Sequence, residues 1–215
     1  MQNLPDRIDR DTPPAFLVLD GVDGCGKSTQ ATRLAEHLRQ ATGREVEHLR
    51  EPGTTPVGES LRRLLLDPEV ELVPEAEMLL FLAARRTLLH ERVAPALAAG
   101  RWVVCERFHA STFAYQGVAG GIGGERTLAA CLEWAGGPLP AVELILDLPL
   151  PLALERRGMV GDRIENQGSE YHLRVAQGYR EYLERAPRAR AIDANGDADT
   201  VARRVWQEVC DVCAG

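Results

Sequence analysis

The residues best suited to chemistry stand close together near the start of the chain, in the segment Gly21-Val22-Asp23-Gly24-Cys25-Gly26-Lys27-Ser28-Thr29. Its Gly-x-x-x-x-Gly-Lys-Ser pattern is typical of a phosphate-binding loop, because glycines let successive backbone N–H groups point toward phosphate oxygens. In such a loop Lys27 reaches the β- and γ-phosphates, and the Ser28 hydroxyl binds Mg²⁺. We therefore expect residues 21–29 to bind a nucleoside triphosphate, the alternative being an ordinary Gly-rich turn.

The surroundings of this segment fit that interpretation. A strand-length apolar run, 15–20, precedes the loop, and an amphipathic helical pattern over 27–42 follows it. Runs of Val, Leu and Ile predict further strands at 45–49, 101–105, 142–147 and 189–192. Further helices are predicted at 57–66, 75–98, 109–117, 125–135, 150–158, 168–185 and 197–212. Strands that alternate with helices form a parallel sheet, so the sequence predicts a three-layer α/β fold with helices flanking a five-stranded parallel sheet.

Length and charge limit the class of protein. A chain of 215 residues has room for one such domain, which we expect over 15–215, behind a flexible tail at 1–14. The net charge of −7 argues against a protein that binds nucleic acid non-specifically. No apolar run approaches the length of a membrane span, and the N-terminal residues lack the apolar core of a signal peptide. We therefore expect a cytoplasmic protein with reduced cysteines and neither a membrane nor a nucleic-acid partner.

A second group of polar residues follows the later predicted strands. Because ligands of parallel sheets bind beyond the carboxyl ends of the strands, this group is a candidate to bind a second, anionic ligand. Arginine suits that role, since its planar guanidinium pairs with two phosphate oxygens. The group contains Arg50, Phe81 and Arg85 one helical turn apart, Glu106, Arg107, Ser111, Thr112, Tyr115 and Gln116, and later Arg156, Arg157 and Arg163. Each member alone has a plainer explanation as a core residue, a solvated helix face or a salt bridge.

Together these motifs resemble those of the thymidylate kinase (dTMP kinase) family. The resemblance spans roughly residues 15–195. It is carried by Asp23 in the loop, Arg50-Glu51-Pro52-Gly53, Phe81-x-x-x-Arg85, Glu106-Arg107-Phe108, Ala114-Tyr115-Gln116-Gly117 and Asp162-Arg163-Ile164-Glu165. It implies a P-loop fold like that of nucleoside monophosphate kinases, ATP and Mg²⁺ as cofactors, dTMP as the acceptor and a homodimer. Because position 24 is glycine, it also implies the bacterial arrangement, in which catalytic arginines come from a lid segment at about 156–168.

The resemblance further implies how the acceptor is bound. Phe81 would stack on the thymine ring, and Arg85 would donate a hydrogen bond to the base. Asp23 would accept a hydrogen bond from the deoxyribose 3′-hydroxyl. The phosphate of dTMP would be bound by Arg50 and Arg107, and the base and sugar pocket would be closed by Ser111, Thr112, Tyr115 and Gln116.

On the donor side, the catalytic residues implied by the resemblance are Lys27, Asp23, Arg107, Arg157 and Arg163. Lys27 and the lid arginines would neutralise the γ-phosphoryl group as it moves, and Ser28 and Glu106 would hold Mg²⁺. The chain departs from the family pattern at two positions, where Glu106 replaces the usual aspartate and Asp20 replaces the usual glutamate. Each departure keeps the charge and moves a carboxylate by about one methylene.

Two other functions remain open. A deoxynucleoside kinase also has a phosphate loop and a Glu-Arg pair after its third strand, but it needs a base to activate a neutral hydroxyl. A P-loop ATPase switch would need no pocket for an acceptor base. Asp23 within the loop and the Phe81–Arg85 pair favour a monophosphate acceptor, so the sequence predicts a kinase that phosphorylates dTMP.

Overall fold

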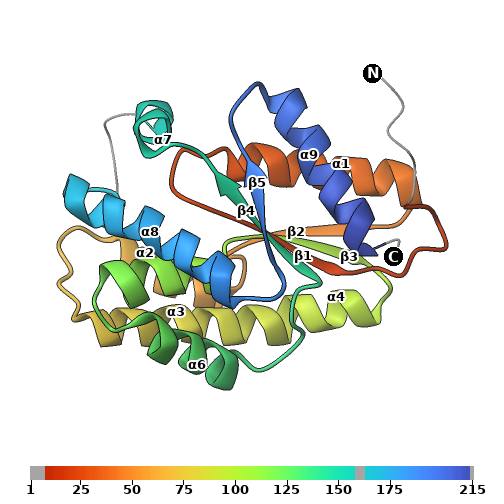
Figure 1. The fold of residues 1–215 in the computed structure, drawn as a ribbon. Helices are drawn as coiled ribbons and strands as arrows, with labels where there is room; N and C mark the ends of the chain where they lie inside the picture. The colour runs from red at the N-terminus through yellow and green to blue at the C-terminus, as the bar shows by residue number, and fades with distance from the viewer. Residues whose placement is uncertain (1–7, 158–162, 214–215) are drawn as a thin grey trace.

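Five short strands form one parallel sheet at the centre of the computed structural model, which describes residues 8–157 and 163–213 (Figure 1). The strands are β1 (Phe16–Asp20), β2 (Val46–Arg50), β3 (Trp102–Glu106), β4 (Val142–Asp147) and β5 (Ala189–Asp193). They lie in the order β2-β3-β1-β4-β5, and every neighbouring pair is parallel. The predicted fold class is confirmed, and the observed strands begin and end within about one residue of the predicted ones.

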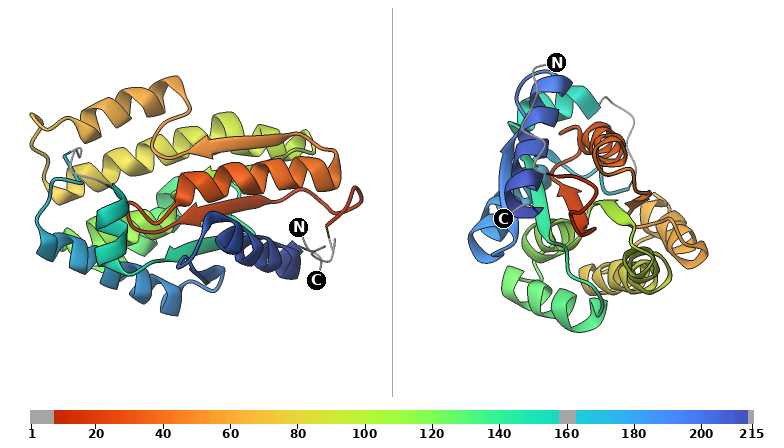
Figure 2. Two further views of the ribbon diagram at one scale, coloured as in Figure 1. Left: turned by 90° about the horizontal axis from the view of Figure 1, so that it is seen from above. Right: turned by 90° about the vertical axis from the view of Figure 1, so that its right-hand side faces the viewer.

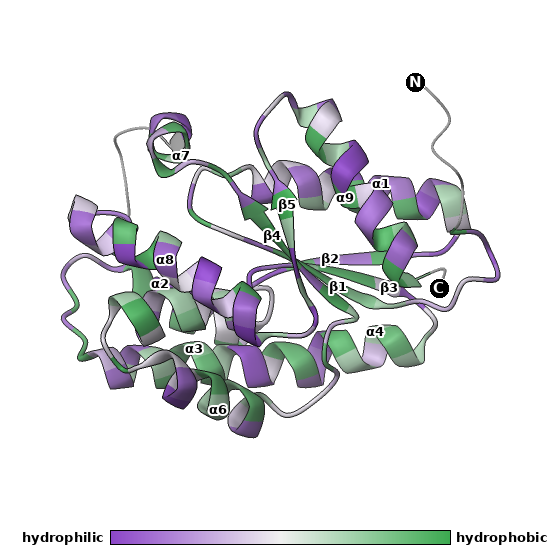
Figure 3. Cartoon of the chain, in the orientation of Figure 1, coloured by the Kyte–Doolittle hydropathy of each residue, from purple (hydrophilic) through white to green (hydrophobic). Residues whose placement is uncertain are grey.

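Helices cover both faces of the sheet, because side chains alternate along each strand and both sets are largely apolar in the central strands β1, β3 and β4. Leu17 and Leu19 of β1 join one core cluster, whereas Phe16 and Val18 join another. The helices are α1 (Lys27–Thr42), α2 (Pro56–Leu66), α3 (Pro74–Leu88), α4 (Ala94–Ala98), α5 (His109–Thr112), α6 (Gly124–Ala135), α7 (Leu150–Arg157), α8 (Ser169–Arg185) and α9 (Ala198–Cys213). Helices α1 and α9 pack together on one side, and α3 packs on α6 (Figure 2). Colouring by hydropathy shows green along the central strands and mixed colours on the helices (Figure 3).

Two of the predicted helices continue through wide, π-helical turns. The predicted helix 75–98 consists of α3, a π-helical turn at Leu89–Val93 and α4. Pro95 has no N–H to donate and its ring crowds the preceding turn, so a wider turn ahead of it keeps the chain helical. The predicted helix 109–117 likewise consists of α5 and a π-helical turn at Phe113–Ala119. Within the described residues, every helix is too short or too polar to span a membrane.

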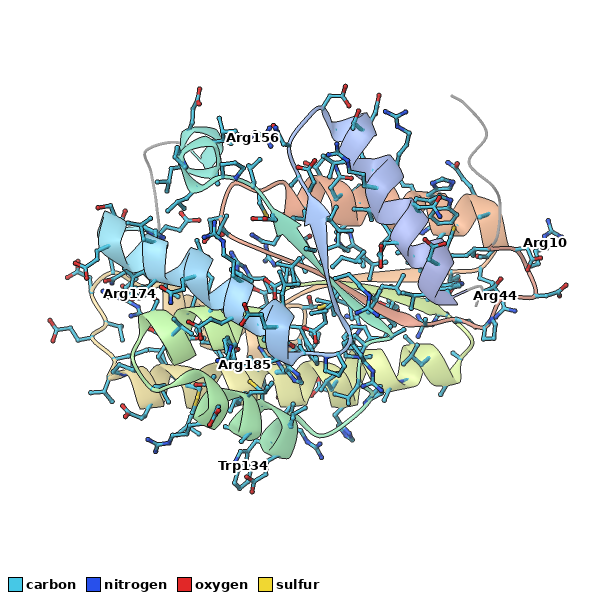
Figure 4. The ribbon with its side chains drawn as sticks, in the orientation of Figure 1. Arg10, Arg44, Trp134, Arg156, Arg174 and Arg185 are labelled. Carbon is cyan, nitrogen blue, oxygen red and sulfur yellow. The ribbon has the colours of Figure 1, made fainter. Side chains whose placement is uncertain are left out.

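Residues 8–14 pack against the domain, although the sequence predicts a flexible tail over 1–14. The Ile8 side chain is 1% exposed and belongs to the core cluster that includes residues of α1 and α9. Arg10 and Arg44 lie side by side at one end of the molecule (Figure 4), where the Arg44 guanidinium donates to the Arg10 carbonyl oxygen at 2.7 Å. The predicted tail is therefore too long, because an apolar side chain buried in the core fixes its second half. Residues 1–7 lie outside the described part of the chain.

A buried carboxyl group lies within the sheet. Glu143 on β4 is 4% exposed, and the Tyr182 hydroxyl donates a hydrogen bond to its Oε1 at 2.7 Å. Burial raises the pKa of Glu143 from its ordinary value of 4.5 to about 7, although the Tyr182 hydrogen bond opposes the rise. The charged form of Glu143 therefore opposes folding.

We expect Glu143→Gln to stabilise the protein at pH 8 and to lose this advantage as the pH falls. The Glu143 carboxyl group loses its proton near pH 4.5 in the unfolded chain and near pH 7 in the folded chain. The free energy of unfolding of the wild type therefore falls as the pH rises between these values. The gain in the free energy of unfolding at pH 8 should be about 3 kcal/mol. Urea unfolding between pH 5 and 8.5 measures it, with the exposed Glu69→Gln as the control. An equal gain at both ends of this range would contradict the assignment.

Candidate functional site

The predicted phosphate loop connects β1 to α1. Gly21 has a φ of 137°, and a Cβ atom at this position would lie 2.7 Å from the Leu146 carbonyl oxygen, so only glycine fits. Gly26, with a φ of 98°, immediately precedes α1. The backbone N–H groups of the first helical turn lack partners within the helix, and they face the loop. This geometry supplies the donors that a phosphate group requires.

A cavity of 630 Å³ opens over the loop. Lys27 lies in its wall, where its ammonium group donates to the carbonyl oxygens of Gly21 and Val22, each at 2.9 Å. The other lining residues include Asp23, Gly24, Cys25, Gly26, Ser28, Thr29, Gln30, Glu51, Glu106, Ala194, Gly196, Ala198 and Val201. Four arginines also line it, namely Arg50, Arg62, Arg107 and Arg156, the last of which Figure 4 labels beside α7. Five cationic side chains at one cavity of an acidic protein suit a ligand with several negative charges.

Ser28 and Glu106, the expected metal ligands, are in contact. The Ser28 hydroxyl donates to Oε2 of Glu106, and His48 Nε2 lies 3.0 Å from Oε1. Burial raises the pKa of Glu106, but the hydrogen bonds from His48 and Ser28 outweigh it and lower the pKa below its usual value. The sequence did not single out His48, which lies on β2 outside any motif.

The oxygen atoms of Ser28 and Glu106 are suitable ligands for Mg²⁺. Magnesium prefers hard oxygen ligands and keeps several waters, so it is usually held by one or two protein groups together with substrate phosphates. The Ser28 hydroxyl and the Glu106 carboxylate are such groups, and they lie at the wall of the large cavity. In the described part of the chain, no cluster of three or more His, Cys, Asp or Glu side chains could hold a metal without such help.

Asp20, at the end of β1, ties the loop to two helices. Its Oδ2 accepts the backbone N–H groups of Phe108 at 2.9 Å and Ser111 at 3.0 Å. Its Oδ1 accepts the Gly21 N–H, the Ser111 hydroxyl and the Tyr179 hydroxyl, at 2.7–2.8 Å. The shorter side chain noted in the sequence thus reaches α5 and α8 and serves as a structural junction.

A second, smaller cavity of 110 Å³ adjoins the first. It is lined by Asp23, Glu51, Pro52, Arg62, Leu66, Phe81, Arg85, Arg107, Ser111, Thr112, Tyr115, Gln116, Ile164 and Glu165. Asp23, Glu51, Arg62 and Arg107 line both cavities, so the two spaces meet at these four side chains. The structure therefore brings together all but one of the predicted acceptor residues in the smaller cavity, beside the phosphate loop.

Asp23 and Arg107 form an ion pair at this junction. The Arg107 guanidinium bonds to Oδ1 of Asp23, while the Tyr115 hydroxyl donates to Oδ2 at 2.7 Å. Arg107 has a φ of 69°, which is uncommon for a residue with a side chain. Its backbone N–H donates to the Leu19 carbonyl oxygen at 2.9 Å. Its guanidinium also donates to Ser111 Oγ at 3.0 Å. The strained backbone and these bonds hold Arg107 where the cavities meet.

Arg85 is held by a buried ion pair. Its Nε lies 2.6 Å from Oε1 of Glu51, and the two side chains are 1% and 2% exposed. Its Nη2 donates to the Phe108 carbonyl oxygen at 2.9 Å and to the Thr112 hydroxyl at 2.8 Å. Burial would lower the pKa of Arg85, but the Glu51 carboxylate raises it above its usual value, so the guanidinium stays charged. Its Nη1 donates to Cys131 Sγ at 3.5 Å, so every guanidinium nitrogen of Arg85 has a protein partner while the side chain lines the smaller cavity.

Arg50, an expected acceptor residue, lies outside the smaller cavity, whereas Arg62, which the sequence did not single out, lines it. Arg50 lines only the large cavity, and its Nη2 lies 3.3 Å from Oε1 of Glu59. Arg62 on α2 lines both cavities and donates to the Pro52 carbonyl oxygen at 3.0 Å. Sequence reasoning missed Arg62, because a Leu-Arg-Arg run in a helix is usually a solvated face.

Of the two expected catalytic arginines of the lid, only Arg163 has a described side chain. The side chain of Arg157 and residues 158–162 lie outside the described part of the chain. Arg163 is described, and it lines neither cavity. Its guanidinium instead pairs with Glu77 on α3, so the structure does not bring it to the phosphate loop.

None of the five cysteines, all of them in the described part of the chain, forms a disulfide bond. Burial raises the pKa of Cys131 and Cys213 to about 11, and it also raises that of Cys25. Thiols that stay protonated are poor nucleophiles and metal ligands.

Known proteins resemble this chain over most of its length. The model of the family described as "Thymidylate kinase" matches residues 19–205. The thymidylate kinase of Psychrobacter sp. (strain PRwf-1) is 41% identical over 200 residues, which are 90% of this chain and 96% of the relative. That of Rhizorhabdus wittichii is 42% identical over 208 residues, covering 93% and 99%. The crystal structure of thymidylate kinase from Ehrlichia chaffeensis superimposes with a TM-score of 0.73 at 28% identity, covering 92% of this chain and 99% of that one.

We expect Glu51→Ala to lower the free energy of unfolding by about 3–5 kcal/mol, because it leaves the Arg85 guanidinium buried without its counter-charge. Urea denaturation followed by circular dichroism measures the change. The matched control is Glu170→Ala, which removes an exposed partner of Arg174 and should cost about 1 kcal/mol or less. Equal losses for the two variants would contradict the proposed importance of the buried pair.

Proposed function

Because the chain belongs to the thymidylate kinase family, we propose that it transfers the γ-phosphoryl group of ATP to the 5′-phosphate of dTMP, giving ADP and dTDP. The observation that carries this proposal is the pair of adjoining cavities that share Asp23, Glu51, Arg62 and Arg107. The larger contains the phosphate loop, and the smaller has an aromatic ring and polar side chains suited to a nucleobase. Two anionic substrates could therefore meet end to end at the shared arginines.

The donor ATP occupies the larger cavity in this proposal. Backbone N–H groups of residues 21–29 bind its phosphates, and Lys27 moves its bonds from loop carbonyls to the β- and γ-phosphates. Ser28 and Glu106 would hold Mg²⁺, which, when bound, neutralises negative charge on the phosphates. The bond from His48 to Glu106 keeps the carboxylate turned toward Ser28.

The acceptor dTMP occupies the smaller cavity. Phe81 stacks on the base, Arg85 donates to it, and Thr112, Gln116 and Ser111 complete the pocket. At the junction Asp23 accepts a hydrogen bond from the 3′-hydroxyl, and the Tyr115 hydroxyl bonded to Asp23 excludes a 2′-hydroxyl by its bulk.

The reaction itself is in-line attack by a phosphate oxygen of dTMP on the γ-phosphorus. A monophosphate oxygen is already anionic, so the protein needs no general base and contributes position and positive charge. Arg107 lies between the substrates, and Arg62 and Arg50 would bind the acceptor phosphate from the walls of the large cavity. Arg156 adds a cation on the donor side. Arg157 stays a candidate catalytic residue, since it follows directly in α7.

A panel of acceptors with ATP and Mg²⁺ tests the function. We expect rapid ADP release with dTMP, at least about tenfold less efficient release with other nucleoside monophosphates, and none with thymidine. Rapid turnover of thymidine would indicate a deoxynucleoside kinase instead. ADP release that does not depend on any acceptor would indicate an ATPase switch.

Lys27→Ala is the catalytic control for that panel. It should lower kcat by about 10²–10³-fold, because it removes a cation from the transferred group, while the Kd of dTMP changes little. Arg33→Ala, at an exposed ion pair elsewhere on α1, should leave both values unchanged.

We further propose that the active protein is a homodimer. Leu79 on α3 and Leu132 and Trp134 on α6 are each more than half exposed, and the two helices that carry them pack together. Trp134 points away from the body of the molecule (Figure 4). Large apolar side chains exposed on adjoining helices are typical of a subunit interface.

Light scattering coupled to gel filtration tests the dimer. We expect a particle of about twice 23.6 kDa for the wild type and a monomer for Leu132→Glu, because a buried charge at an apolar interface costs several kcal/mol. Leu173→Glu, at an exposed leucine of α8, is the control and should stay dimeric. A monomeric wild type would exclude the proposal.

A further inference from the structure

Arg163 and Glu77 form a largely buried ion pair beside the smaller cavity. The guanidinium Nη2 bonds to Oε2 of Glu77, and the side chains are 13% and 11% exposed. Arg163 also binds the end of α2, since its Nε donates to the Leu65 carbonyl oxygen at 2.9 Å and its backbone N–H donates to Leu66 at 3.3 Å. The last carbonyl groups of a helix lack partners within it, so a cation at this end stabilises the helix.

Glu77 uses its second oxygen as well. Its Oε1 accepts a hydrogen bond from the Gln116 side chain at 2.6 Å. Glu77 lies in the first turn of α3, one turn ahead of Phe81, so the two side chains are neighbours on the same helix. A single carboxylate thus connects Arg163 to the π-helical turn that carries Gln116.

The segments joined by this pair are walls of the smaller cavity. Four of its lining residues belong to segments that contain or contact Arg163 or Glu77, namely Leu66, Phe81, Gln116 and Ile164. Arg163 itself does not line that cavity or the larger one. In this arrangement Arg163 would act on the shape of the cavity through these neighbours.

We infer that Arg163 is a positioning residue for the acceptor nucleotide. Together with Glu77 it holds the end of α2, the start of α3, the Gln116 turn and the residues after 162 in the arrangement that shapes the base pocket. This role differs from the neutralisation of the γ-phosphoryl group that the resemblance implies. It rests on the proposed function, because it assumes that the smaller cavity binds dTMP.

The effect of Arg163→Ala on dTMP and on ATP distinguishes the two roles. A loosened pocket should raise the Kd and KM of dTMP by about tenfold and reduce the preference for dTMP over dUMP, while kcat at saturating dTMP and the KM of ATP change less than about threefold. Calorimetric titration with dTMP alone measures the Kd without turnover. A large fall in kcat with an unchanged Kd of dTMP would overturn the inference and favour the phosphoryl role.

Three further variants make the test specific. Arg163→Lys keeps a cation opposite Glu77 and should recover part of the lost affinity, and it carries the test if the alanine variant does not fold. Glu77→Gln should weaken dTMP binding in the same way, and the double variant with Arg163→Ala should lose no more than the worse single variant. Arg174→Ala, at an exposed pair on α8, is the matched control and should leave the Kd unchanged.

Additive losses in the double variant, or a loss in the control equal to that in Arg163→Ala, would contradict the inference. A failed inference remains distinct from a failed function. If the wild type does not bind and phosphorylate dTMP, the proposed function is wrong. If it does, and Arg163→Ala leaves the Kd of dTMP unchanged, only the positioning role is wrong.

Discussion

The buried carboxylate of Asp20 is the constraint on which the site depends. It ends the central strand β1 and accepts bonds from the phosphate loop, from both backbone and side chain at the start of α5, and from Tyr179 on α8. A carboxylate in the interior is stable only when its oxygens are bonded in this way. The same bonds place the loop, the Arg107 segment and α8 relative to one another. Asp20 therefore fixes the phosphate loop against the Arg107 segment, and both segments line the two adjoining cavities.

Charge is arranged around the cavities in opposed pairs. Arg85 with Glu51, Arg107 with Asp23, and Arg163 with Glu77 each join segments that are far apart in the sequence. Pairs of this kind contribute little net stability compared with apolar packing, but they fix orientation, because either partner alone would be buried unpaired. They allow the chain to keep many guanidinium groups near a phosphate-binding loop while its net charge remains −7.

Local patterns in the sequence were sufficient for the sheet and the phosphate loop. The apolar run of β1 predicts a buried strand, and the glycines at 21 and 26 permit the positive φ angles of the loop. Ser28 and Glu106 meet because parallel strands end at the same edge of the sheet. Arg62 and His48 could not be found in this way, since each resembles an ordinary surface residue of a helix or an edge strand. The partner of Arg163 lies 86 residues away on α3, and only packing of the helices decides that contact. The sequence also placed the end of the N-terminal tail too late, because a single isoleucine in a polar segment gives no periodic signal of burial.

That isoleucine has a consequence for anyone who trims the protein for crystallisation. Ile8 fills part of the interior shared with α1 and α9. A version that starts at residue 15 would leave a void there, and losing a buried isoleucine side chain typically destabilises a domain by about 2–5 kcal/mol. Shortening should stop before this anchor, and a purification tag is better joined ahead of it through a spacer that leaves the anchor free to insert.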